Sequence, residues 1–443
     1  MVFARLGGGR APTGIITSRV FQRFSVRRPN SLFSLALVAV VSFLGGAGLV
    51  ASVGVAGAST YRSLDIFAKV LAYVENSYVD EVDSRTLIHG AIRGMLATLD
   101  SYTVFLPAEE YRHMKADTAG EFGGLGIEVR KEGDRLVVVE PLEDSPASRA
   151  GILPGDWIVS IDDTPTANLS VTEAVKMMRG QPGTKVRLGL FREGFSQPLE
   201  FVLLRDRIQI RSVEARLYPG GIGYVRIKSF QEKTESFLTK ALGELRQQNG
   251  KELSGLVLDL RGNPGGLLDQ AVRVADRFLA QGEIVTTRGR GGKILDIETA
   301  HRAGTEPDYP IVILVDDRSA SASEVLAGAL QDHGRAVVMG TTTFGKGSVQ
   351  TVVDLDDGSG LKITVARYYT PKHRSIHGTG IEPDVVVPRD GQGIAPPLPV
   401  LVAADGEAAE TDDTQLRVAL RTLRSWDAFL AQLSAQVQTA QAE

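Results

Sequence analysis

The chain has 443 residues, of which 43% are apolar and 23% are charged, and its formal net charge is −4. This length allows two or three domains with hydrophobic cores, and the charge balance argues against binding nucleic acid through a basic surface. The chain contains no cysteine, which excludes disulfides, thiolate metal sites and cysteine-protease chemistry.

The first 58 residues have the charge pattern of a targeting segment. Residues 1–30 carry six arginines and no acidic residue, and residues 31–58 carry no charge. An apolar run of this length can span a bilayer, and arginines before it favour a cytoplasmic N-terminus. The small residues at 56–58 resemble a signal-peptidase site, so the run is either a removed signal peptide or an uncleaved inner-membrane anchor; a buried helix is the remaining alternative. Both exported alternatives place the rest of the chain in the periplasm or envelope of a bacterium.

Two segments of different character follow the apolar run. Residues 62–117 repeat apolar residues at helical spacing, which predicts a helical N-terminal region. Residues 118–205 contain short β-rich runs between Gly and Pro turn signals, with one helix after a candidate N-cap at Ser170. This second segment is predicted to be a small β-rich domain.

The longest segment, residues 210–390, alternates apolar strands with helical patterns, which predicts a layered α/β domain. Its helices are expected over 232–248, 266–280 and 322–333. A Pro-rich, acidic linker at 391–414 and an amphipathic C-terminal helix at 415–443 come last. We expect that helix to dock on the body of the protein or on a partner subunit.

Ser321 lies between a buried strand and a helix, in the segment DDRSASASEVLAGALQDHG at 316–334. Ser321 and Glu324 have the S-x-x-E spacing of a capping box, so a purely structural role is one interpretation. A serine at a helix N-terminus is also suited to catalysis, because free N–H groups and the helix dipole can stabilise an oxyanion beside it.

A nucleophilic serine needs a base, and no histidine stands in a suitable place. His333 lies at the far end of the helix that Ser321 begins. Lys346, between two glycines, is the alternative base, because burial can make a lysine lose its proton. Gln350 shares a face with Lys346 on an extended strand and can accept a hydrogen bond from the neutral amine. An exposed loop lysine is the competing interpretation.

The same glycines raise the possibility of a nucleotide site. Gly340, Gly345 and Lys346 match most of the phosphate-binding P-loop pattern. Gly347, however, stands where magnesium binding requires Ser or Thr, and the following residues read as a strand and not as a helix. An ATPase is therefore a minor alternative.

Two glycine-rich turns offer further binding groups. In the segment 256–272, a buried strand runs into Gly265 and Gly266, whose N–H groups can bind an anion, although a plain tight turn is equally consistent. In FGGLGIEV at 122–129, a glycine loop precedes a strand, an arrangement that can bind the terminal carboxylate and the backbone of a peptide. The residues expected to do so are Gly124, Leu125, Gly126 and Ile127.

These segments together resemble one protein family. SASASE at 319–324, FGKGSVQ at 344–350, DLRGNPGG at 259–266 and the PDZ-like strings are similar to those of the carboxyl-terminal processing peptidases, tail-specific serine proteases that carry a PDZ domain. The resemblance covers approximately residues 62–390. It implies an α/β core of the Clp-protease and crotonase type, with an inserted PDZ domain and a helical N-terminal segment.

The resemblance also implies roles for individual residues. By that pattern Ser321 is the nucleophile, Lys346 the general base and Gln350 the residue that orients it. The implied oxyanion donors are Ala322, Gly265 and Gly266. Arg179 matches a position that relays peptide binding from the PDZ domain to the active site. Asp332 matches an acidic residue sometimes grouped with the site, although its helical distance from Ser321 argues against a direct role.

The function implied is that of an exported, ATP-independent serine endopeptidase. It would bind proteins or peptides by their unstructured C-terminal tails and cleave them through an acyl-enzyme. No metal, nucleotide, nucleic acid or cofactor is expected, and the terminal helices suggest a homo-oligomer. The rival interpretation is a non-catalytic PDZ adaptor on a protease-like body, which gives no reason for the joint presence of Ser321, Lys346 and Gln350.

Overall fold

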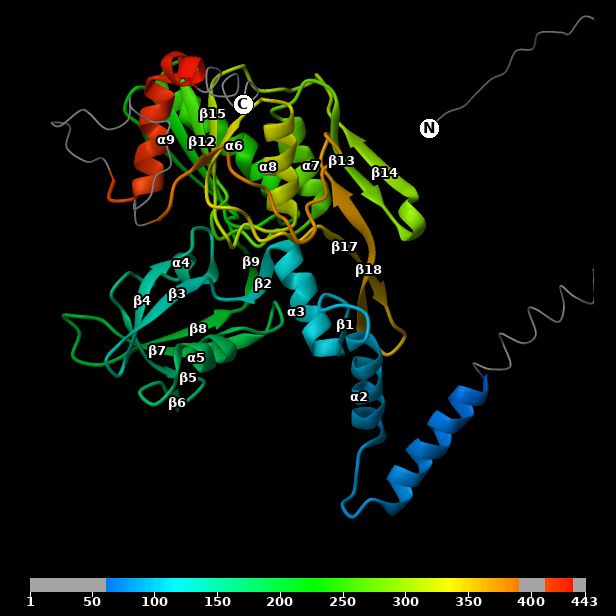
Figure 1. Ribbon diagram of the computed structural model, residues 1–443. Coiled ribbons are helices and arrows are strands. Elements are labelled where there is room, and N and C mark those ends of the chain that lie inside the picture. The colour runs from blue at the N-terminus through cyan, green and yellow to red at the C-terminus, as the bar shows by residue number, and fades with distance from the viewer. Residues whose placement is uncertain (1–60, 390–410, 433–443) are drawn as a thin grey trace, which may run out of the picture. The chain divides into compact units, whose positions relative to one another are not determined.

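The computed structural model describes residues 61–389 and 411–432 (Figure 1). The described residues divide into two compact units between Ile88 and His89. The basic segment at 1–30 and the apolar run at 31–58 lie outside the described residues. Within the described ranges, no helix combines the length and the apolar composition that a membrane crossing needs.

The first unit consists of a helix over residues 61–77 and the start of helix α2 (Ser84–Ala97). Large apolar side chains on the first helix are mostly exposed: Tyr61, Leu64, Ile66, Phe67, Val70 and Tyr73. Asp83 begins α2, because its carboxylate accepts the Thr86 N–H at 2.9 Å. The helical spacing over 61–77 therefore corresponds to a helix whose large apolar side chains are mostly exposed among the described residues.

The region 62–117 is not purely helical. Strand β1 (Val104–Leu106) interrupts it before helix α3 (Ala108–Ala119), and β1 pairs antiparallel with residues 360–362 of strand β18. The segment ahead of the β-rich domain thus belongs to the same sheet as residues more than 250 positions later.

The β-rich domain is a twisted antiparallel sheet in the order β3-β4-β5-β7-β8. Its strands are β3 (Ile127–Glu132), β4 (Arg135–Pro141), β5 (Trp157–Ile161), β7 (Lys185–Phe191) and β8 (Leu199–Leu204), with β6 (Thr164–Pro165) on β5. Two helices, α4 (Pro146–Arg149) and α5 (Val171–Met178), complete its core. Ser170 and Glu173 form the capping box that begins α5.

A two-stranded ribbon joins this domain to the remainder of the chain. Strand β2 (Glu121–Gly124) enters the domain and strand β9 (Asp206–Gln209) leaves it, and the two pair antiparallel. The domain is therefore an insertion whose two ends are hydrogen-bonded to each other.

The α/β domain is built on a six-stranded sheet in the order β10-β11-β12-β15-β16-β19. Its strands are β10 (Val213–Tyr218), β11 (Ile222–Ile227), β12 (Gly255–Asp259), β15 (Ile311–Val315), β16 (Val337–Gly340) and β19 (Val385–Val386). From β11 onwards each neighbouring pair is parallel, so the carboxyl ends of these strands lie at one edge.

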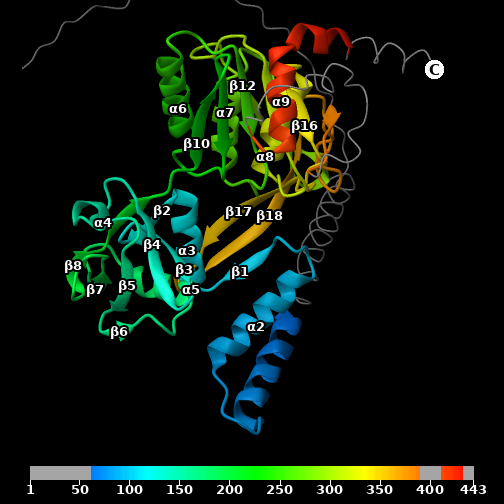
Figure 2. The same cartoon turned by 90° about the vertical axis from the view of Figure 1, so that its left-hand side faces the viewer.

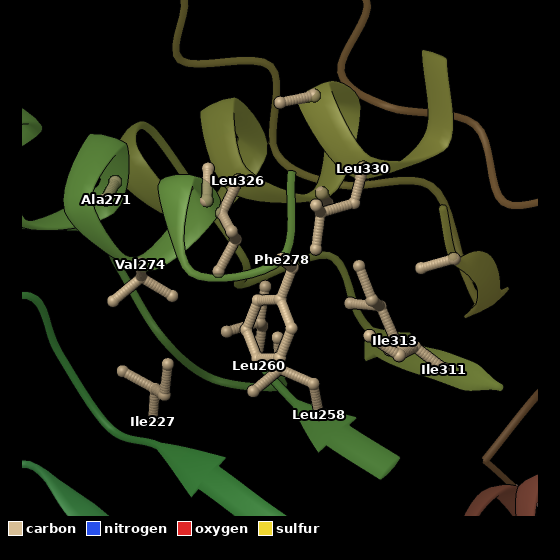
Figure 3. Packing of buried hydrophobic residues seen from close by; sticks show 14 of the residues in the cluster. Ile227, Leu258, Leu260, Ala271, Val274, Phe278, Ile311, Ile313, Leu326 and Leu330 are labelled. Carbon is tan, nitrogen blue, oxygen red and sulfur yellow. The ribbon is translucent and has the colours of Figure 1, made fainter. Parts of the chain in front are cut away.

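Helices cover both faces of this sheet (Figure 2). Alternate residues of β12 and β15 point to opposite sides, so that both strands are buried throughout. One face packs on α6 (Thr234–Asn249), α7 (Leu268–Asp276) and α8 (Ala322–Asp332), with Phe278 at the centre of the cluster (Figure 3). The other face packs on α9 (Thr414–Arg424).

The C-terminal helix packs on the body of the protein, which is one of the two positions expected from the sequence; the other was a partner subunit. Leu416, Leu420 and Leu423 of α9 are buried against β12, β15 and β16. Asp413 caps the helix and, with Gln415, also accepts hydrogen bonds from Arg261. Residues 390–410, most of the expected linker, lie outside the described residues, as do residues 433–443.

A second sheet carries the segment that follows Lys346. Its order is β1-β18-β13-β14, with β17 on the other edge of β18. The strands are β13 (Glu283–Arg288), β14 (Ile294–Thr299), β17 (Ser348–Asp354) and β18 (Gly360–Tyr369), and the 3-10 turn η1 (Arg290–Gly292) joins β13 to β14. Between Val349 and Gln350 the partner on β18 changes from Ala366 to Thr364, which marks a β-bulge.

Candidate active site

Ser321 is held in a strained backbone conformation at the start of α8. It follows the carboxyl end of β15, it is 7% exposed, and its φ is 56° with ψ at −114°. A non-glycine residue in this region costs of the order of 1–3 kcal/mol, and such strain occurs preferentially at functional sites. The Ser321 side chain faces the hydroxyl of Tyr368 on β18. Burial raises the pKa of Tyr368 to about 12, and the neighbouring Ser321 side chain opposes this rise.

The three serines of SASASE have different environments. The hydroxyls of Ser319 and Ser323 donate to the backbone carbonyls of Leu260 at 2.9 Å and Asn263 at 3.0 Å. These two side chains therefore fasten the nucleophile loop to the neighbouring turn. Among the three hydroxyls, that of Ser321 is the one with no hydrogen bond to a backbone carbonyl in the described part of the chain.

Glu324 joins Ser321 to the lysine segment. Its carboxylate is fully buried and accepts the N–H of Ser321 at 2.7 Å, of Gly345 at 2.7 Å and of Lys346 at 2.8 Å. The Thr343 hydroxyl supplies a further hydrogen bond at 2.5 Å. Because charged acceptors make the stronger hydrogen bonds of proteins, this carboxylate fixes the two segments relative to each other. The capping-box spacing thus has a structural basis, but three of the four donors come from beyond the helix.

Lys346 is half-buried, in the loop that precedes β17. Burial lowers the pKa of its amine, repulsion from Lys362 lowers it further, and attraction to Glu324 opposes both. Nζ lies 4.9 Å from the centroid of the Tyr102 ring. Among the residues that the structure describes, no group hydrogen-bonds to Nζ.

Gln350 lies on β17, but its amide does not make the expected hydrogen bond with Lys346 within the described residues. Its amide nitrogen donates to Ser348 Oγ at 2.7 Å and to Thr364 Oγ1 at 3.4 Å. The expected hydrogen bond from the lysine amine is absent from the described part of the chain. The bulge beside Gln350 turns its side chain toward β18, which strict alternation along a strand does not anticipate.

The glycine turn after β12 packs directly against Ser321. A side chain at Gly265, whose φ is 101°, would meet the Ser321 Cβ at 2.8 Å and the Ala322 nitrogen at 3.0 Å. The Gly265 N–H donates to Asn263 Oδ1 at 2.9 Å, so the expectation that it binds an oxyanion does not fit this arrangement. Within the described residues, the N–H groups of Gly266 and Ala322 have no acceptor.

Asp332 and His333 lie at the opposite end of α8 from Ser321. Asp332 accepts the Lys372 N–H at 2.8 Å and pairs with Arg374. His333 Nε2 lies 2.7 Å from the Glu283 carbonyl oxygen. Both residues therefore fasten the end of the helix to neighbouring loops, in agreement with the expectation that neither acts on Ser321.

The β-rich domain carries a separate groove of about 240 Å³ between β3 and α5. The four residues expected to bind a peptide line this groove, together with Val129, Val175 and Met178. They are Gly124, Leu125, Gly126 and Ile127. Arg179, which ends α5, also lines the groove, and its guanidinium lies 4.7 Å from the centroid of the Phe122 ring. The groove offers an apolar floor beside backbone N–H groups, which suits a peptide end.

Three segments of the chain match known families. Residues 221–387 match Peptidase family S41, residues 137–192 match the PDZ domain, and residues 50–110 match the N-terminal domain of the activating protease CtpB. The chain is 44% identical to a carboxy-terminal-processing protease of Bartonella bacilliformis, over 79% of this chain and 82% of that protein. It is 35% identical to the carboxy-terminal processing protease CtpB of Bacillus subtilis, over 76% of this chain and 70% of that protein.

A solved structure shows a similar level of identity. The photosystem II D1 C-terminal processing protease is 35% identical and covers 73% of this chain and 92% of its own, with a TM-score of 0.43. Ser321, Lys346 and Gln350 all fall in the range matched to Peptidase family S41. Of the residues that line the groove, Val175, Met178 and Arg179 fall in the PDZ range, and the others precede it.

Sequence reasoning missed two aromatic residues beside this site, Tyr102 and Tyr368, and it considered Glu324 only as a capping residue. The sequence does indicate a larger role for Glu324, because a buried acidic residue among small and apolar neighbours at a helix start requires hydrogen-bond donors around it. Tyr102 had none, since its segment precedes the β-rich domain and reaches the site only through the pairing of β1 with β18.

Proposed function

The chain belongs to the carboxy-terminal processing protease family, as a serine protease with a PDZ domain, and from this premise we propose that Ser321 is its nucleophile and Lys346 its general base. The observation that carries the proposal is the buried Glu324 carboxylate, which accepts backbone N–H groups of both residues. A strained serine at a helix N-terminus and a lysine whose pKa is lowered by burial are the two partners that this chemistry needs.

In the proposed reaction, the neutral Lys346 amine removes the proton of the Ser321 hydroxyl as Oγ attacks the peptide carbonyl. The N–H groups of Ala322 and Gly266 donate to the oxyanion, and the charged amine then protonates the leaving nitrogen. Water, deprotonated by the same lysine, hydrolyses the acyl-enzyme. Gln350 orients Lys346 from the adjacent strand once the amine has moved toward Ser321.

Covalent labelling tests the nucleophile directly. We expect a serine-reactive fluorophosphonate to modify Ser321 and to leave Ser319 and Ser323 unlabelled, since their hydroxyls are committed to backbone carbonyls. Lys346→Ala should slow the labelling strongly because the hydroxyl then has no base. Peptide mapping by mass spectrometry would reveal the modified residue, and a label on either flanking serine would refute the assignment.

We further propose that the PDZ groove binds the C-terminal tail of the substrate. Free N–H groups of the Gly124–Ile127 loop would hold the terminal carboxylate, and Val129, Val175 and Met178 favour an apolar last residue. Unstructured tails are the natural ligands, because the peptide must pair with the edge of β3 as an extended strand.

A charge placed in the groove tests this tail binding. Val175→Asp should raise KM for a tail-bearing substrate about tenfold or more, because the new carboxylate repels the terminal carboxylate. Its kcat should change little, since Val175 lies outside the cleavage site. Val202→Asp is the matched control, because Val202 is 57% exposed on β8, at the opposite edge of the sheet. Equal KM values for the two variants would contradict the proposal.

Export and self-association complete the proposal. The arginine-rich start and the uncharged run at 31–58 support an envelope location, either membrane-anchored or released after signal cleavage. The exposed apolar residues of the 61–77 helix support a homo-oligomer that covers them. Intact mass and fractionation of the natural protein check the first point, and light scattering checks the second; a full-length soluble monomer would refute both.

A further inference from the structure

We propose that the turn at residues 100–103 is a positioning element of the active site, an inference that rests on the proposed role of Lys346. In it, Tyr102 supplies the resting place of the protonated lysine, and Asp100 fixes the turn to the strand beside Gln350. The turn lies before the PDZ domain and outside the range matched to Peptidase family S41. It falls instead in the range matched to the N-terminal domain of the activating protease CtpB, so the proposed positioning element lies outside the catalytic family match.

The turn is rigid because one carboxylate organises it. Asp100 accepts the N–H groups of Tyr102 and Thr103, both at 2.8 Å, and the Thr103 hydroxyl at 3.1 Å. These hydrogen bonds lower the pKa of Asp100, although burial acts in the opposite direction. The Asp100 carboxylate stays ionised, and the position of the Tyr102 backbone follows from it.

The same turn is fastened to β18. The Thr364 hydroxyl donates to Asp100 at 3.3 Å, and the Thr364 N–H donates to Thr103 Oγ1 at 3.2 Å. Gln350 Nε2 also reaches Thr364 Oγ1 at 3.4 Å. Asp100, Thr364 and Gln350 thus form one chain of contacts, which ends at the residue expected to orient the lysine.

Tyr102 is the ring on which the lysine amine rests, with Nζ 4.9 Å from its centroid. The face of an aromatic ring attracts an ammonium group and has little attraction for a neutral amine. The charged groups that act on Nζ from the other elements are Lys362 on β18, which repels it, and Glu324 on α8, which attracts it. Once deprotonated, the amine loses the attraction of the ring and is free to approach Ser321.

This arrangement makes a prediction about the pH profile. If the ring favours the ammonium form, its removal makes the lysine easier to deprotonate. We expect the acid limb of kcat/KM in Tyr102→Leu to move to lower pH by about 0.5–1 unit, the size of a partly buried cation–π contact. The plateau should also fall, because the amine is less well placed. Tyr102→Phe keeps the ring and should keep the midpoint of the wild type.

A fluorinated series separates the ring's charge distribution from its shape. Phenylalanine at position 102 with one, two and three ring fluorines keeps the packing while the attraction for a cation declines. We expect the midpoint to fall stepwise along the series in the full chain. A midpoint that stays at the wild-type value in Tyr102→Leu and through the series would overturn the inference.

Activity of Lys346→Ala tests the proposed base separately from the role of Tyr102. If Lys346→Ala retained its activity, the base itself would be wrongly assigned. If Lys346→Ala were inactive while the midpoint ignored position 102, the base would stand and the role of Tyr102 would fail. Thermal unfolding of each variant shows whether a lower plateau reflects loss of folded protein, and the midpoint is insensitive to that loss.

Discussion

Lys346→Ala is expected to lower kcat by about 10²–10⁴-fold, the contribution of a positioned general base. Lys346→Arg should be equally inactive, although it keeps the charge and most of the length, because a guanidinium does not lose its proton at accessible pH. Single-turnover cleavage of a tail-bearing peptide measures both. Activity above a tenth of the wild type in either variant would show that another group accepts the serine proton.

A substitution at Lys362 tests the same base by changing the pKa of Lys346 without removing its amine. It lies on β18 and lowers the pKa of the Lys346 amine by repulsion. Lys362→Gln removes that repulsion, so the pKa of Lys346 rises and the acid limb of the profile moves to higher pH, while the plateau is preserved. Because only the neutral amine is a base, activity in the wild type rises with pH through the lowered pKa of Lys346. A shift of Lys362→Gln toward lower pH would contradict this account.

Glu324→Gln is expected to be nearly as damaging, although it exchanges one atom. The carboxylate accepts four hydrogen bonds, and the amide would place an NH₂ group against at least one N–H that now has an acceptor. Loss of a buried charged acceptor costs about 2–4 kcal/mol of folding free energy. We also expect kcat to fall at least about 100-fold, because Ser321 and Lys346 lose their shared anchor and small displacements of reacting groups are costly.

Glu173→Gln is the control for this substitution. Glu173 occupies the same S-x-x-E position, but it is exposed and its carboxylate accepts hydrogen bonds from Ser170 of its own helix start. We expect its melting temperature and kcat to stay close to those of the wild type. Thermal unfolding and peptide cleavage of both variants measure the difference, and similar behaviour of the two would mean that Glu324 is only a helix cap.

The parts of this molecule that follow from local patterns are visible in its sequence. The parallel strands are buried on both faces and read as unbroken apolar runs, and the helices expected at 232–248 and 322–333 correspond to α6 and α8. Strand β1 could not be found in this way, because three residues have no period and their partner is far along the chain.

The same limit applies to the site. Ser321, Lys346 and the glycine turn are separate motifs, and the structure brings them together. What joins them is non-local: the Asn263 side chain that occupies the Gly265 N–H, the bulge that redirects Gln350, and the β1 pairing that brings Tyr102 to the lysine. Spacing along the chain reports residue types that suit a reaction, and it does not report which hydrogen bonds they have already made.

The paired ribbon of β2 and β9 has a consequence for how this architecture can vary. Because Glu121–Gly124 and Asp206–Gln209 are hydrogen-bonded to each other, the chain leaves and returns at adjacent points. The entropic cost of closing a loop grows only slowly with its length. The length of the segment enclosed by the ribbon therefore has little effect on the stability of the protease core. A peptide-reading cassette of another specificity could be exchanged between residues 124 and 206 without altering the ends that the core must hold.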